Sequence, residues 1–174
     1  MPKPSPFLRS FPSRGTGFTW IEMIIILAVI GILAAMAIPS LQDQAVKRQV
    51  KDGMALADVA EKGVQAIWSA TGDMPKNNKD AGVPDKEKIV GSMIKEVAIE
   101  DGAVTLVYGN NASKLLDGKK LTLRPAVVAD TPTVPIAWLC AQVSVPKGME
   151  IRGKDQTDIQ PSWLPVECRV SNAK

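Results

Sequence analysis

The chain has 174 residues, of which 45% are hydrophobic and 22% charged, with a formal net charge of +3. It contains no histidine and only two cysteines, which excludes imidazole-based catalysis and histidine metal sites. The basic excess comes from Lys3, Arg9 and Arg14, because the rest of the chain carries 18 basic and 18 acidic residues. This balance does not favour nucleic-acid binding by residues 18–174.

The first predicted element is an apolar segment, residues 18–39, that contains a single acid. Its 21 residues from Phe18 to Ile38 make a helix of roughly 30 Å, the thickness of a bilayer's hydrocarbon core. Glu22 is the only charged residue of the segment. A carboxylate there costs up to about 3 kcal/mol near the bilayer centre, so we expect it to be functional and to have a cationic partner.

The cation that pairs with Glu22 is absent from the apolar segment, since no basic residue lies between Arg14 and Lys47. Cleavage between Gly17 and Phe18 would create an α-ammonium one helical turn before Glu22, on the same chain or on a neighbour. Such a cut makes residues 1–17 a leader peptide.

The charge distribution predicts how the chain is oriented in a membrane. Basic residues precede the apolar segment without accompanying acids, so residues 1–17 should stay cytoplasmic and residues 40–174 should be exported. A cleaved secretory signal peptide, with Ala35–Ala37 as its cleavage site, and a plain signal anchor are alternatives. Glu22 counts against the first, together with the length of the apolar run, and stays unexplained by the second.

Gly17, Phe18, Thr19, Glu22 and the apolar run that ends at Pro39 resemble the N-terminus of a type IV pilin precursor. The resemblance, closest to type IVa pilins, implies that a prepilin peptidase cleaves after Gly17 and N-methylates Phe18. It further implies that Glu22 guides subunit assembly. Gly31 and Pro39 occupy positions where the family commonly places a flexible glycine and a kinking proline.

Beyond Pro39 the chain can continue as an amphipathic helix over residues 40–70. Pro39 itself lacks a backbone donor and predicts a kink. Gly53 and Gly63 each cost about 1 kcal/mol relative to alanine, so this helix depends on packing. The apolar residues of its buried face recur at spacings of three and four: Val46, Val50, Met54, Ala57, Ala60, Val64 and Ile67.

A polar connecting loop, residues 71–92, precedes a predicted antiparallel sheet within residues 93–143. Two strands, 96–100 and 103–108, flank Asp101-Gly102, a dipeptide that favours a tight hairpin turn. Further strands are predicted at 120–128 and 136–143, and Pro125 should confine part of the third strand to an edge or a bulge. The fold class is therefore α+β. The resemblance implies the pilin lollipop fold, a long kinked N-terminal helix packed on a four-stranded antiparallel sheet.

Cys140 and Cys168 are the two cysteines, and an even number in an exported domain suggests a disulfide. Two free buried thiols are the alternative. A bridge would close a loop of about 28 residues and contribute roughly 3 to 4 kcal/mol. In many pilins a C-terminal disulfide loop is an exposed surface, which implies that residues 140–168 face solvent or a neighbouring subunit.

The sequence contains no recognisable catalytic or cofactor motif. Glycine-rich phosphate loops are absent. Asp155 and Asp158 lack the spacing of a calcium loop, so we expect no metal and no cofactor. We therefore expect a protein that is not an enzyme. The alternative, a membrane-anchored enzyme, would need a catalytic cluster, and the sequence shows none.

These observations predict a structural subunit of a type IV pilus, the fimbrium that serves adhesion, twitching motility or DNA uptake. The precursor would be a single-pass inner-membrane protein with its C-terminus exported, and the processed subunit would join an extracellular pilus. Its expected partners are other pilin subunits, prepilin peptidase and the inner-membrane assembly machinery. A minor or competence DNA-uptake pilin and a type II secretion pseudopilin are alternatives, although charge does not indicate DNA and pseudopilins usually lack a C-terminal disulfide loop.

Overall fold

The computed structural model describes residues 17, 19–141 and 143–169. The chain divides into two compact units, Met1–Pro39 and Ser40–Lys174. The long helix α1 (Trp20–Met54) begins in the first unit and continues into the second. In the first unit its large apolar side chains are exposed, and among the described residues this is the helix long and apolar enough to cross a membrane.

Two helical segments run along the second unit, where one continuous helix over 40–70 was predicted. Helix α1 ends at Met54, and α2 (Ala57–Thr71) follows after a two-residue turn. At this turn the Leu56 N–H donates to the Gly53 carbonyl over 3.1 Å, a tighter turn than that of an α-helix. The predicted end is confirmed, since Gly72 caps α2 in the left-handed conformation, at φ 76°.

Glycine at position 53 lets a strand residue approach the helix closely. A Cβ added at Gly53 would lie 2.6 Å from Cε1 of Tyr108. The Tyr108 hydroxyl donates to the Val50 carbonyl over 2.7 Å. A buried tyrosine therefore packs on the last turn of α1 just before the helix is interrupted.

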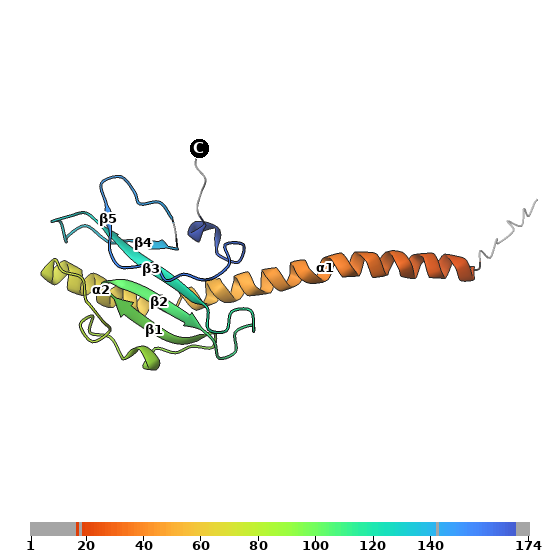
Figure 1. The fold of residues 1–174 in the computed structure, drawn as a ribbon, viewed down its shortest axis with the longest axis horizontal. Coiled ribbons are helices and arrows are strands. Elements are labelled where there is room, and N and C mark those ends of the chain that lie inside the picture. The colour runs from red at the N-terminus through yellow and green to blue at the C-terminus, as the bar shows by residue number, and fades with distance from the viewer. Residues whose placement is uncertain (1–16, 18, 142, 170–174) are drawn as a thin grey trace, which may run out of the picture. The chain divides into compact units, whose positions relative to one another are not determined.

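An antiparallel sheet packs against these helices (Figure 1), with its first four strands in the order β1-β2-β3-β4. The predicted hairpin is confirmed, because Asp101 and Gly102 both have positive φ, 48° and 80°. A short fifth strand, which was not predicted, pairs with β3. The strands are β1 (Ile94–Glu100), β2 (Ala103–Tyr108), β3 (Lys120–Val127), β4 (Ala137–Cys140) and β5 (Glu150–Ile151).

Pro125 lies in β3, an inner strand, at a point beyond the end of its pairing with β2, so the prediction of an edge or a bulge holds only for this local part of the strand. On the β4 side of the sheet, Pro125 is paired in register with Trp138. Its carbonyl accepts the Arg152 N–H over 2.9 Å, so its backbone polar groups face the opposite side. There the pairing of β2 with β3 has ended at Leu123. Because proline lacks an N–H, it cannot donate a hydrogen bond to β2, and at this position no β2 residue is paired with it.

The core lies between the helices and one face of the sheet, which makes the fold α+β as predicted. Val46 and Val50 of α1 are buried in the same cluster as Val64 and Trp68 of α2. The sheet contributes buried residues at alternate positions, as expected for a strand with one face in the core: Val97, Ile99, Val104, Leu106, Tyr108, Leu121 and Leu123.

A buried asparagine attaches the loop over residues 71–92 to the edge of the sheet. The Asn78 side chain donates to the Val97 carbonyl over 2.9 Å and accepts the Ile99 N–H over 2.8 Å. These two bonds satisfy backbone groups that an edge strand would otherwise leave unpaired. The loop also contains a short 3-10 helix, η1 (Lys86–Lys88).

Candidate assembly site

Glu22 forms a reciprocal capping arrangement with Thr19 at the start of α1. The Glu22 N–H donates to Thr19 Oγ1 over 3.3 Å, and the Thr19 N–H donates to Glu22 Oε2 over 3.4 Å. This is a capping box, which satisfies two of the N–H groups that a helix start leaves without partners. The Thr-x-x-Glu spacing is typical of a capping box, but the prediction from sequence considered only the charge of Glu22.

The capping box leaves the Glu22 carboxylate available to a further donor. Both residues are exposed, and a carboxylate can accept about four hydrogen bonds. The positive end of the helix dipole also favours an anion in the first turn. A cation next to the helix start can therefore bind Glu22 without removing the cap.

The other residues of the N-terminal motif are placed only in part. Gly17 is exposed and lies two positions before Thr19 in the sequence, whereas Phe18 lies outside the described residues. Gly31 lies within α1, and a Cβ added there would meet no atom within 4 Å. Pro39 also lies within α1. Cleavage, methylation, flexibility at Gly31 and the kink at Pro39 stay predictions.

The predicted disulfide between Cys140 and Cys168 is present, with the two Cα atoms 5.0 Å apart. It joins the end of β4 to η2 (Val166–Cys168), and both cysteines are buried. Within the enclosed segment, Trp163 Nε1 donates to Asp43 Oδ1 of α1 over 2.9 Å. The disulfide and this bond together attach the C-terminal segment to the sheet and to the helix.

Asp155 and Asp158 are engaged within the chain. Asp155 Oδ1 accepts the Thr157 N–H over 2.9 Å. Asp158 Oδ1 accepts the backbone N–H of Lys120 over 2.6 Å, and its other oxygen lies 3.7 Å from Lys119 Nζ. Asp158 thus fastens the disulfide-bounded segment to the start of β3, whereas Asp155 stabilises a turn within that segment.

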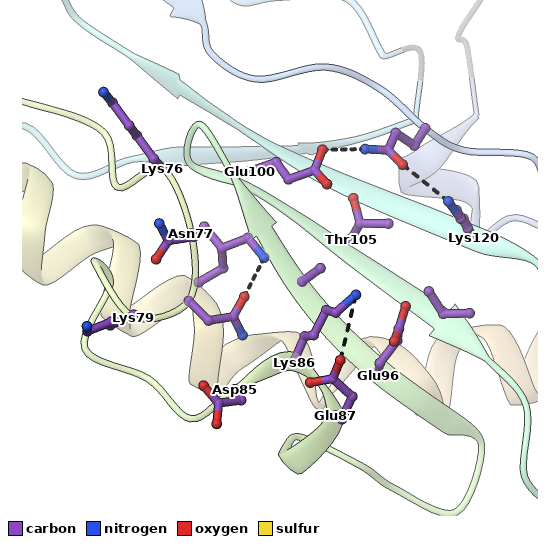
Figure 2. A pocket seen from close by; sticks show the side chains of 15 residues that line it. Lys76, Asn77, Lys79, Asp85, Lys86, Glu87, Glu96, Glu100, Thr105 and Lys120 are labelled. Atoms are coloured by element: carbon purple, nitrogen blue, oxygen red, sulfur yellow. Dashed lines mark hydrogen bonds and ion pairs between the residues drawn. The ribbon is translucent and has the colours of Figure 1, made fainter.

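A polar groove of about 510 Å³ lies beside β1 and β2 (Figure 2). Glu100 Oε2 accepts from Gln156 Nε2 over 2.7 Å, and Gln156 Oε1 accepts from Lys120 Nζ over 3.3 Å. Lysines and acids are equally numerous in its lining, so the groove offers no excess positive charge to a polyanion such as DNA. The charged lining residues are Lys76, Lys79, Lys86, Lys120, Asp85, Glu87, Glu96 and Glu100.

Sequence reasoning overlooked Glu61, which lies next to the buried stripe of α2. Burial, together with the nearby charge of Asp58, raises the pKa of Glu61 to about 7. Its carboxylate makes no hydrogen bond or ion pair with any other described residue. The sequence did place Glu61 between Ala60 and Val64 of the predicted buried face, and an acid in this position is only partly solvated.

Comparisons with known proteins identify the family of the chain. A family model for pilin, a bacterial filament protein, matches residues 46–169. The chain is 34% identical over 159 residues to the type IV major pilin protein PilE1 of Neisseria gonorrhoeae, a match that covers 88% of this chain and 86% of the relative. It is 35% identical over 162 residues to a fimbrial protein of Neisseria meningitidis serogroup B, with 88% and 93% covered.

A relative from another genus extends the match along almost its full length. The chain is 36% identical over 169 residues to a fimbrial protein of Pseudomonas aeruginosa, which covers 89% of this chain and 97% of the relative. The range matched by the family model includes the sheet and the disulfide-bounded segment. The chain belongs to the pilin family and is a structural subunit of a type IV pilus.

Proposed function

We propose that this pilin is made as an inner-membrane precursor and becomes competent to polymerise only after cleavage of the Gly17–Phe18 peptide bond. Hydrolysis adds one water and leaves a carboxylate on Gly17 and an amine on Phe18, which is protonated near neutral pH. N-methylation would keep this amine basic and therefore cationic. Prepilin peptidase is the expected enzyme for both steps.

The observation that carries the proposal is the capped, exposed Glu22 carboxylate at the start of an apolar helix. Its partner Thr19 immediately follows Phe18, so the new ammonium arises beside the capped turn of its own chain. In a filament, the ammonium can instead reach Glu22 of an adjacent subunit. An unpaired acid in a dry fibre core is strongly penalised, so this pair would set the axial register of the subunits.

The exposed apolar part of α1 supplies both membrane anchoring and fibre packing. Its side chains have no covering residues among the described part of the chain. Ala28, Gly31 and Ala35 follow one another at spacings of three and four, which lets neighbouring helices approach closely. The same helix would therefore leave the bilayer and enter the filament core, assisted by the inner-membrane assembly machinery.

Mass spectrometry of sheared surface filaments tests this function. We expect the chain as the dominant component, beginning with methylated Phe18 and lacking the two thiol hydrogens of Cys140 and Cys168. Recovery of the chain only in membranes, with residues 1–17 still attached, would overturn the proposal.

A further inference from the structure

Glu61 lies in a hollow of about 280 Å³ on the side of α2. Asp58 and Lys62 of the same helix line it, together with Gln65 and with Trp138 of β4. Gln65 is held in place, since its Oε1 accepts the Ile136 N–H over 3.0 Å and its Nε2 donates to Ser69 over 3.0 Å. The hollow is thus a depression with one fixed side chain, an aromatic wall and two carboxylates.

The charges in this hollow are not balanced by close contacts within the chain. Lys62 reaches neither Asp58 nor Glu61 within ion-pair distance in the described part of the chain. A half-buried carboxylate without a cation or hydrogen-bond donor is unfavourable. The hollow is therefore suited to receive a cation from outside the chain.

The loop on the opposite side of α2 carries an exposed lysine, Lys79. Gly63 packs against the loop, and a Cβ added there would lie 2.6 Å from Val83 Cγ1 and 2.7 Å from the Ala81 carbonyl oxygen. Two residues correspond to about 200° around an α-helix, so Glu61 faces away from this loop. Lys79 is exposed in the loop and, among the described residues, lies in no ion pair.

Local hydrogen bonds hold the Lys79 turn in one conformation. The Gly82 N–H donates to the Lys79 carbonyl over 3.0 Å, and the Val83 N–H donates to the Asn78 carbonyl over 3.1 Å. Asn78 itself is bonded to β1. Lys79 is therefore presented from a fixed backbone on the side of α2 opposite Glu61.

We propose that the Asp58–Glu61 hollow of one subunit docks against the Lys79 turn of a second copy of this chain. A filament repeats one head-to-tail contact, in which two different surfaces of the subunit meet. The hollow and the Lys79 turn satisfy this requirement because they lie on opposite sides of α2 and carry opposite, unpaired charges. The inference rests on the proposed filament function and specifies a lateral contact within it.

Charge reversal in the full-length chain tests the contact. Glu61→Lys and Lys79→Glu should each lower the yield of sheared filaments about tenfold, because each places like charges together. The double variant, which restores opposite charges, should return to within about twofold of the unchanged chain. Lys154→Glu, a reversal at an exposed lysine of the disulfide-bounded segment, is the control for net charge and should leave the yield unchanged.

Folding is monitored separately by the amount of subunit in membranes and by oxidation of Cys140 with Cys168. A variant with normal subunit and disulfide levels but few filaments is defective in assembly. If Glu61→Lys does not accumulate in membranes, the double variant Glu61→Gln with Lys79→Glu is compared with Lys79→Glu alone. The double variant should give more filaments, because it no longer places two acids together.

Cross-linking gives the positive evidence. Filaments with Glu61→Cys and Lys79→Cys should form interchain products with a short bismaleimide, whereas each single variant and the pair Glu61→Cys with Lys154→Cys should not. Normal filaments from both single charge reversals, or no product from the Glu61–Lys79 pair, would overturn the contact. The proposed function would fail differently, through absent filaments or an uncleaved leader in the unchanged chain.

Discussion

Trp163 donates its indole N–H to the Asp43 carboxylate over 2.9 Å, which joins the disulfide-bounded segment to α1 across 120 positions of sequence. Trp163→Phe keeps most of the ring but removes the donor. Because the bond is exposed, we expect the free energy of unfolding to fall by about 1 kcal/mol. Denaturant unfolding of the full chain in detergent measures this, with Ser162→Ala as the neighbouring control that should change little.

The disulfide should contribute more than any single hydrogen bond. Replacement of Cys140 and Cys168 by serine should lower the free energy of unfolding by roughly 3 to 4 kcal/mol, because the unfolded chain loses its constraint. In the double serine variant, backbone hydrogen exchange should become faster mainly in the enclosed segment, and less so in β1 and β2. Equal stability of the oxidised chain and the double serine variant would contradict the prediction.

Tyr108 provides a test of the contact between sheet and helix. Tyr108→Phe removes the hydroxyl that donates to the Val50 carbonyl over 2.7 Å. We expect the free energy of unfolding to fall by about 1 to 2 kcal/mol, since the ring stays packed and the Val50 carbonyl keeps its helical environment.

Burial also raises the pKa of the Tyr108 phenol, so in the folded chain this phenol should ionise only above the ordinary tyrosine value. Ultraviolet absorbance during alkaline titration checks this point.

Glu61 should make stability depend on pH. Its pKa rises from the ordinary value of 4.5 to about 7 on folding. Well below pH 4.5 the carboxyl is protonated in both states, so it has no effect. Between pH 4.5 and about 7 the unfolded state loses this proton while the folded state keeps it, so stability falls as pH rises. The charged groups that line its hollow are Asp58 and Lys62, while β4 contributes the neutral Trp138.

Glu61→Gln should therefore stabilise the chain by about 1 kcal/mol above pH 7, after allowance for solvent screening of a half-exposed group. The difference between the two chains should vanish in acid. Thermal unfolding across this pH range measures it. A constant difference at every pH would indicate a packing effect of the substitution and contradict the role of ionisation.

Glu22→Ala should separate assembly from folding. We expect the chain to insert, to be cleaved and to form its disulfide, because Glu22 is exposed and the second unit does not depend on it. Filaments should be absent or strongly reduced. Thr19→Val is the matched control for the capping box, since it removes the hydroxyl and keeps the acid. If that variant also failed to assemble, the cap and not the charge would be the essential feature.

The main elements could be predicted because their signals are local. An apolar run of helical length, a helical spacing of three and four, and an Asp-Gly dipeptide between alternating residues each restrict the backbone over a short stretch. The predicted hairpin and helix end were confirmed for this reason, and the buried face of the amphipathic stretch was found, although on two helices instead of one. The pairing of Cys140 with Cys168 followed from the even number of cysteines.

The interruption at Ala55–Leu56 could not be predicted in the same way, because it accompanies the packing of Tyr108, more than fifty residues away, against Gly53. The sequence indicated that Pro125 disturbs the pairing of its strand, but it does not show that β2 stops pairing with β3 at Leu123. The capping box at Thr19 was readable but was overlooked beside the stronger charge argument.

The sequence by itself determined the family, the apolar helix and the acid at its start, since each depends on residue order and on transfer from water to an apolar environment. Only the tertiary structure decided which charges lack partners. Glu61 resembles any solvated acid in the sequence, and its altered pKa arises from burial beside Asp58 and Trp138. Desolvation and ion pairing depend on distances between segments that are remote along the chain, and these distances exist only after folding.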